Sequence, residues 1–291
     1  MLPHEVCFGA FLILTWLRLV GSAGFFGALT LAWLAGMGVN LWLLIRCRRA
    51  PTPLNARLSL LYYPIAMNVF FALLGPAVAR FHPMPMDAAL QRVDAALIGT
   101  NLSVRLQPLV HPFLTEFFSG CYFLFFPFLG FSLIYYFVGE LGLLRKFCVG
   151  LFTIYGLGFI GYTLVPARGP WVAMADQFTT PLTGWILTRA NDAVVRAGSN
   201  GVDVFPSLHC AVSSYLLFFD RWHRRWRYRL YLVPCVGLWL STIYLRYHYL
   251  VDCLCGFALA ATALWLVRPK RNAVNGDVAS PSCTTPSALT N

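Results

Sequence analysis

Long apolar segments, separated by short clusters of charged or turn-forming residues, dominate the pattern along this chain. These segments occupy residues 7–20, 24–45, 58–79, 113–138, 146–165, 206–219, 229–245 and 249–267. Several approach or exceed the roughly 20 apolar residues that an α-helix needs to cross a bilayer. The pattern therefore predicts an all-α, polytopic membrane helix bundle.

Two segments depart from this pattern. Between Met84 and Gly99 apolar and polar residues alternate, which is typical of an amphipathic helix at the membrane interface. Asp87 and Asp94 are seven residues apart and share one face of that helix, either as part of a solvated face or as a metal pair. Residues 166–205 form a long irregular connection, and a connection of this length in a compact bundle is usually functional or disordered.

The composition agrees with a membrane protein, because 58% of the residues are hydrophobic and only 11% are charged. A soluble domain carries about 25% charged residues. The net charge of +11 is compatible with nucleic-acid binding, but the arginines lie in short clusters between apolar segments. This arrangement is typical of positive-inside loops, so we expect a membrane and no nucleic acid as the partner.

The distribution of positive charge predicts the orientation. Four short connections carry four, two, five and three of the 22 lysines and arginines, and they are residues 46–57, 139–147, 220–229 and 268–271. The positive-inside rule places these connections, and the C-terminus, in the cytoplasm. The opposite ends of the spans then face the periplasm, the extracellular space or an organelle lumen.

Two motifs place a histidine where an apolar segment begins. The first is Phe205-Pro206-Ser207-Leu208-His209, and the second ends with His248 and Asp252. Ionisable groups at such positions in a membrane protein mark functional sites. His248 and Asp252 are four residues apart, so they share a face if the segment is helical. A carboxylate there would fix one imidazole nitrogen and leave the other free as a nucleophile.

The residues around the histidines can hold and protonate an anion. Pro206 and Ser207 begin a helix whose free N–H groups favour a phosphate, and His209 is placed to protonate a leaving oxygen. Arg168 and Arg246 could clamp the same phosphate, Arg246 only if the chain breaks between the last two spans. The alternatives are a structural His–Asp pair, hydrogen-bonded structural histidines and arginines that reach to the interface.

These motifs resemble those of the type 2 phosphatidic acid phosphatase superfamily, over roughly residues 80–267. The segment Phe205–His209 is similar to the second motif of that family, His248 with Asp252 to the end of the third, and Val165–Trp171 to the first. The inositol-phosphorylceramide-synthase-like branch looks most similar on the residues that follow. They are Thr242–Asp252, Asp87, Asp94, His111, Pro112 and Glu116.

The resemblance implies a role for each motif residue. His248 would form a phosphohistidine, His209 would act as the acid for the leaving group, and Asp252 would orient His248. The implied substrate-binding residues are Arg168, Ser207, Pro206, Arg246, Thr242 and Glu116. Two positions depart from the hydrolase pattern, because Gly161 replaces a lysine and Thr242 replaces an arginine. The loss of two cationic phosphate ligands favours the transferase-like branch.

We therefore expect an integral-membrane phosphotransferase or phosphatase that acts on a lipid phosphate or phosphodiester, with no cofactor and no metal. The acceptor would be a polyol, a lipid or, in a plain phosphohydrolase, water. The alternatives are a non-catalytic transporter or scaffold with the same bundle, and a metal-dependent enzyme that uses Asp87 and Asp94. The expected organisation is N-terminal transmembrane helices in residues 1–57, a six-helix core in residues 58–267 and a disordered cytoplasmic tail in residues 268–291.

Overall fold

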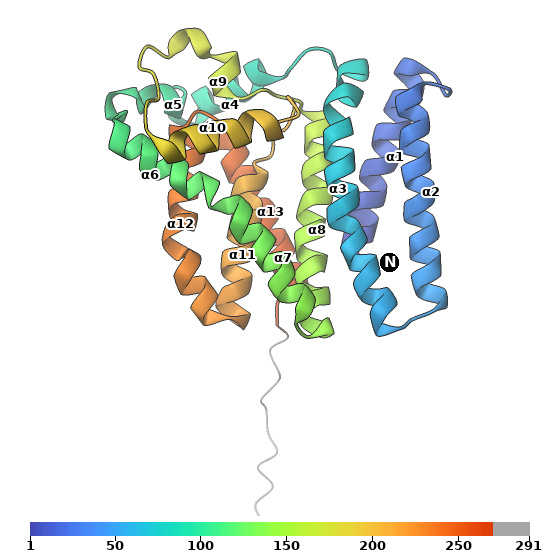
Figure 1. Ribbon diagram of the computed structural model, residues 1–291. Helices are drawn as coiled ribbons and strands as arrows, with labels where there is room; N and C mark the ends of the chain where they lie inside the picture. Colours follow the sequence, from blue (N-terminus) through green and yellow to red (C-terminus); the bar gives the residue numbers. More distant parts are fainter. Residues whose placement is uncertain (270–291) are drawn as a thin grey trace, which may run out of the picture.

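The computed structural model describes residues 1–269 as a bundle of α-helices (Figure 1). The long helices are α1 (Pro3–Ala23), α2 (Ala28–Arg49), α3 (Pro53–Phe81), α6 (Pro112–Phe123), α7 (Phe125–Val138), α8 (Leu141–Leu164), α11 (Leu208–His223), α12 (Arg225–Tyr244) and α13 (Leu250–Val267). The predicted all-α class is confirmed. Residues 270–291, which include most of the predicted disordered tail, lie outside the described residues.

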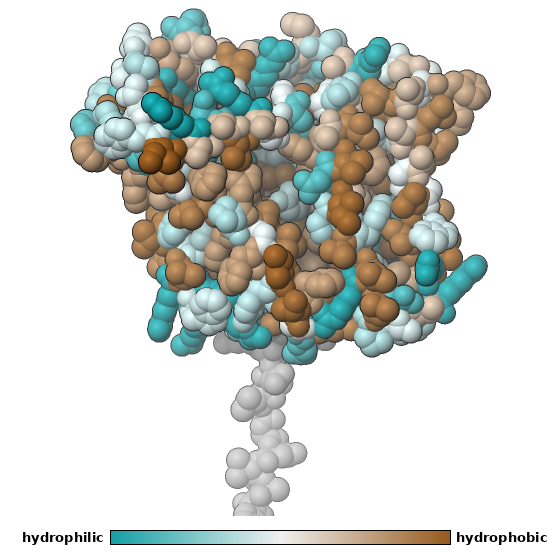
Figure 2. Space-filling view, in the orientation of Figure 1, coloured by the Kyte–Doolittle hydropathy of each residue, from teal (hydrophilic) through white to brown (hydrophobic). Residues whose placement is uncertain are grey.

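The bundle has the length and surface of a multi-pass membrane protein. Six of its segments are long and apolar enough to cross a bilayer, namely α1, α2, α3, α6 with α7, α8 and α13. Large apolar side chains such as Ile65, Ile134 and Val233 are more than 60% exposed on the outside of the bundle. Figure 2 shows apolar side chains over the middle of the molecule and hydrophilic ones towards its two ends. The protein is therefore an integral membrane protein.

Short elements cover one end of the bundle, at the top in Figure 1. They are α4 (Asp87–Ile98), α5 (Leu102–Arg105), η1 (Gln107–Leu109), α9 (Pro170–Ala173), η2 (Ala175–Gln177) and α10 (Ile186–Gly198). The prediction of an irregular connection over residues 166–205 is wrong in one part, because α10 contributes 13 helical residues to it. This helix forms because the Glu116 carboxylate accepts hydrogen bonds from the N–H groups of Trp185, Leu187 and Thr188 at its start.

The predicted single span over residues 113–138 is broken at Leu124 into α6 and α7. Pro127 explains the break, because its ring removes one backbone donor and crowds the carbonyl of Phe123, four residues before it. The last turn of α6 carries Tyr122, whose side chain faces the centre of the bundle.

The helix α8 packs closely against the beginning of α11 through glycines. A Cβ atom at Gly161 would lie 2.3 Å from Cδ of Pro206, and one at Gly158 would lie 2.5 Å from Cδ2 of Leu208. Side chains at these two positions would push away the segment that carries His209. The lysine that the hydrolase pattern has at the position of Gly161 therefore does not fit without moving Pro206.

Candidate active site

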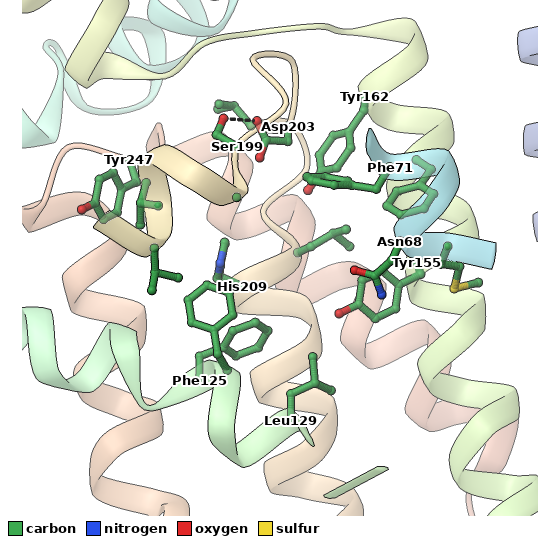
Figure 3. A pocket seen from close by; sticks show the side chains of 18 of the residues that line it. Asn68, Phe71, Phe125, Leu129, Tyr155, Tyr162, Ser199, Asp203, His209 and Tyr247 are labelled. Carbon is green, nitrogen blue, oxygen red and sulfur yellow. Dashed lines mark hydrogen bonds between the residues drawn. The ribbon is translucent and has the colours of Figure 1, made fainter. Parts of the chain in front are cut away.

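A cavity of about 350 Å³ lies beneath the short elements and extends between α3, α7 and α8 (Figure 3). Three of the predicted site residues line it, namely Arg168, His209 and His248. Its polar wall also contains Ser199, Asp203, Tyr162 and Tyr247, and the rest of the lining is largely apolar. The cavity thus joins a polar chamber to an apolar channel between membrane-spanning helices.

His248 lies in the turn between α12 and α13, because the chain reverses after Tyr244. Arg246 has a φ of 68° in this turn, and the N–H group of His248 donates to the Thr242 carbonyl over 3.0 Å. The turn supplies the break between the last two spans that the sequence left open. The segment from His248 to Asp252 is not one continuous helix, since only Asp252 belongs to α13, so the condition for a shared helix face is not met.

Asp252 reaches His248 from the first turn of α13. Its Oδ2 atom accepts from the N–H group of Tyr249 over 2.8 Å and lies 3.6 Å from Nδ1 of His248. Both residues of the pair are buried. The 3.6 Å separation is an ion-pair distance, slightly longer than a hydrogen bond. It leaves Nε2 as the imidazole nitrogen that does not face the carboxylate.

The electrostatic surroundings of His248 act in opposite directions. Burial lowers the pKa of its imidazole, while the adjacent Asp252 carboxylate raises it, and the net result is a pKa above the ordinary 6.5. The charge of Asp203 adds to the upward shift. The carboxylate therefore stabilises a positive charge on His248.

His209 faces His248 from the first turn of α11, and the centroids of the two rings are 5.8 Å apart. Ser207 is the N-cap of this helix, and its Oγ atom accepts from the N–H group of Cys210. The Tyr122 hydroxyl lies 3.0 Å from Nε2 and 3.1 Å from Nδ1 of His209. This partner could not be recognised from the sequence, because Tyr122 lies within an apolar span 87 residues earlier in the chain.

Pro206 and Ser207 lie behind the histidines and do not line the cavity. Ser207 is fully buried, and its N–H group donates to the Asp252 carbonyl over 3.0 Å. These two residues fix the start of α11 against the start of α13. Direct contact of either with a substrate stays a prediction.

Arg168 is the cation of the polar wall. Its side chain is exposed to the cavity and forms no hydrogen bond or ion pair within residues 1–269. The neighbouring Gly169 has a φ of +84°, and a Cβ atom there would lie 2.5 Å from the Tyr247 carbonyl oxygen. The turn that carries Arg168 is therefore pressed against the turn that carries His248, with the guanidinium group available to an anion.

Asp87 and Asp94 connect the motifs, and the prediction of a solvated face for them is wrong. The Asp87 carboxylate accepts from the N–H groups of Arg168 and Gly169 and from the Tyr249 hydroxyl. Asp94 accepts from the N–H groups at the start of α13, those of Leu250 and Val251. Both aspartates are buried, and these donors occupy the carboxylate oxygens that the alternative of a metal pair requires.

Glu116, Thr242 and Arg246 do not line the cavity. Glu116 caps α10, and the Thr242 hydroxyl donates to the Trp239 carbonyl. The Arg246 guanidinium donates to the Thr180 carbonyl and lies 4.1 Å from the centre of the Phe178 ring. These three residues therefore support the elements around the site, and their role as substrate ligands stays a prediction.

The model of the PAP2 superfamily matches residues 88–266, and the chain belongs to this superfamily. The predicted family is thus confirmed, and the matched region contains all three motifs.

A more specific similarity links the chain to a bacterial protein. This chain is 29% identical over 153 residues to a phosphoinositol dihydroceramide synthase of Bacteroides thetaiotaomicron. The match covers 47% of this chain and 49% of the relative, so the chain spans about half the length of that curated relative. This name agrees with the branch that the motifs resemble most. No solved structure matches the chain.

Proposed function

We propose that this protein is a phosphotransferase that moves a headgroup-phosphoryl unit from one membrane lipid to a second hydroxyl compound through a phosphohistidine on His248. The observation that carries the proposal is the pair of facing histidines on one cavity, 5.8 Å apart, of which one is backed by a buried carboxylate. A nucleophile, an acid and an orienting group are the parts that this reaction requires.

In the first half-reaction, Nε2 of His248 attacks the phosphorus atom of the lipid. A P–N bond forms and the P–O bond to the lipid alcohol breaks. His209 gives its proton to the departing oxygen, and Asp252 stabilises the positive charge that develops on His248. The guanidinium group of Arg168 neutralises charge on the phosphate oxygens.

In the second half-reaction, an acceptor hydroxyl attacks the same phosphorus atom. The P–N bond breaks, a P–O bond to the acceptor forms, and the acceptor proton goes to His209. A sphingoid or other lipid alcohol as acceptor gives a transferase, and water gives a plain phosphohydrolase. Two observations favour the transferase. Gly161 stands where the hydrolase pattern has a lysine, and the bacterial relative is named as a synthase.

The proposal includes a side of the membrane and a path for the lipid. The short connections rich in arginine lie at the opposite end of the helices from His209 and His248, which supports an active site on the non-cytoplasmic face. The apolar part of the cavity, between α3, α7 and α8, suits the chains of a lipid that enters from the bilayer.

Labelling of introduced cysteines with an impermeant maleimide in intact cells tests the predicted side. Asp176→Cys, in η2 at the end of the bundle that carries the proposed site, should react from outside. Glu140→Cys, at the start of α8, should react only after the cells are opened. The natural cysteines set the background, so the parent protein is the control. The reverse pattern would place the site in the cytoplasm.

Activity measurements on His248→Ala and His209→Ala test the proposed mechanism. Diacylglycerol release from fluorescent phosphatidylinositol should be abolished in His248→Ala. It should fall by about 10²–10⁴-fold in His209→Ala, which is the usual contribution of a general acid. His223→Ala, a histidine at the other end of α11, is the matched control and should retain activity. A wild-type rate in His248→Ala or in His209→Ala would contradict the proposed mechanism.

A further inference from the structure

Asp203 brings a second charge into the polar chamber. It lies four residues before Ser207, and its backbone pairs with Ala167 in an isolated parallel β-bridge. This bridge holds the segment with Asp203 against the segment with Arg168, and both side chains line the cavity. The polar wall therefore carries a carboxylate and a guanidinium group on neighbouring segments.

The carboxylate of Asp203 has capacity for a ligand. Its Oδ1 atom accepts from the Ser199 hydroxyl over 2.7 Å, and Figure 3 shows both side chains on the cavity wall near Tyr162. Within residues 1–269 neither Asp203 nor Arg168 takes part in an ion pair, although the two segments are bridged. Burial raises the pKa of Asp203, against the opposing effects of the Ser199 hydrogen bond and the charge of His248.

The chemistry of a carboxylate limits what this part of the cavity can bind. An ionised carboxylate only accepts hydrogen bonds, so it suits hydroxyl or ammonium donors. It repels a doubly charged phosphate monoester in the same chamber. An ammonium ligand would also face the guanidinium group of Arg168, whereas an uncharged polyol meets no repulsion from either side chain. The Ser199 hydroxyl, whose proton is donated to Asp203, can accept a hydrogen bond from such a polyol.

We propose that Asp203 and Ser199 form a subsite for the hydroxyl groups of a polyol headgroup that is esterified to the phosphate of the donor lipid. This inference rests on the proposed function and specifies its donor. The headgroup stays on phosphorus while the P–O bond to diacylglycerol breaks and the P–N bond to His248 forms. The proton on the departing oxygen comes from His209, so the subsite takes part in binding and not in proton transfer.

The variant Asp203→Asn tests this subsite, because it keeps the shape and the acceptor for Ser199 but removes the charge. Diacylglycerol release by the purified full-length protein is measured in mixed micelles from fluorescent phosphatidylinositol, phosphatidylcholine and phosphatidic acid. We expect kcat/KM for phosphatidylinositol to fall at least about 10-fold, since a neutral amide oxygen is a weaker acceptor. The value for phosphatidic acid should rise, because repulsion of its phosphate is relieved.

Each other outcome contradicts the subsite. Equal changes in kcat/KM for phosphatidylinositol and phosphatidic acid, including no change, would show that Asp203 does not contribute to headgroup specificity. A fall for phosphatidylcholine as large as that for phosphatidylinositol would remove the preference for polyols, and a fall for phosphatidylcholine alone would indicate a cation subsite. If the wild-type protein releases diacylglycerol from none of the three lipids, the proposed function itself fails.

Two further variants make the test independent of folding. Asp192→Asn changes an exposed aspartate on α10 that pairs with Arg196, and it should keep the wild-type ratio of the two kcat/KM values. Ser199→Ala removes the hydroxyl that orients Asp203, and it should lower the ratio of phosphatidylinositol to phosphatidic acid in the same direction but less. An unchanged ratio in Ser199→Ala would contradict the subsite even if Asp203→Asn did not fold.

Discussion

At the scale of single residues, the reactivity of the site depends on how His248 is protonated. Its imidazole is buried, which disfavours the charged form, and Asp252 lies 3.6 Å away, which favours it. The net upward shift of the pKa means that His248 holds its proton at a pH where a free histidine has lost it. In the proposed mechanism only the neutral imidazole of His248 attacks phosphorus, so the raised pKa means that a higher pH is needed to form the nucleophile.

This balance predicts a change in pH dependence for Asp252→Asn. In the wild-type protein, kcat/KM should fall as the pH drops through a pKa of His248 that lies above 6.5. In Asp252→Asn the upward effect is lost and burial remains, so this acid limb should move to a lower pH. The rate at high pH should also fall, by about 100-fold or more, because the imidazole loses its orientation.

A pH–rate profile of both proteins with phosphatidylinositol measures this shift. His209→Ala provides a comparison, because its loss should lower the rate while the acid limb that belongs to His248 is retained. An acid limb at the same pH in Asp252→Asn and the wild type would contradict the assigned pairing.

The motif residues show what the sequence could predict at this scale. His209, His248 and Asp252 are recognisable because they belong to short continuous motifs with a fixed spacing. Tyr122 and Asp203 are not, because their meaning depends on cavity geometry made by segments that are distant in the chain. Asp203 lies two residues before the second motif in the sequence. Only the β-bridge to Ala167 brings it to the same wall of the cavity as Arg168.

At the scale of elements, α4 holds the first and third motifs together. Asp87 accepts from the turn that carries Arg168, and Asp94 accepts from the start of α13, where Asp252 lies. The negative carboxylate at the start of α13 also complements the partial positive charge of a helix N-terminus. Burial raises the pKa of Asp94, although hydrogen bonds from Leu250 and Val251 oppose this shift. The helix α4 therefore aligns the turn that carries Arg168, the proposed anion ligand, with the start of α13, beside the proposed nucleophile His248.

Removal of this connection should affect both stability and activity. Asp94→Ala leaves the N–H groups of Leu250 and Val251 without their acceptor, at a cost of about 1–3 kcal/mol in the free energy of unfolding. We expect a lower Tm in detergent and a lower kcat, because α13 carries Asp252. Arg92→Ala, which changes an exposed side chain of the same helix, should behave like the wild type. A normal Tm for Asp94→Ala would show that α4 does not stabilise α13.

The helices themselves were largely predictable, because membrane spans depend on the apolar content of a continuous segment. The break at Leu124 and the formation of α10 were not. The first depends on how a proline inside a span is accommodated, and the second on a cap that Glu116 supplies from another helix. The hydrogen bonds from α4 to the first and third motifs were also not predictable. The sequence pattern does not distinguish a buried aspartate from a solvated one.

At the scale of the whole molecule, the bundle separates two chemical environments. One end carries the short elements and the polar chamber, and the other carries the connections rich in arginine. Between them the cavity continues along α3, α7 and α8, which suits the proposed binding of a lipid with its chains among apolar side chains and its phosphate at the histidines. Glycines at the contacts of α8 with α11 and of the first-motif turn with Tyr247 allow this close arrangement.

The central claim is that His248 carries the phosphoryl unit between two substrates. The most direct measurement is to mix the purified protein rapidly with phosphatidylinositol labelled with ³²P, quench in alkali and map the label by peptide mass spectrometry. We predict an adduct that is stable to alkali and labile to acid on the peptide with His248, absent in His248→Ala and increased when the acceptor is omitted. Turnover by the wild-type protein without any such adduct, or an adduct on another residue, would contradict the mechanism.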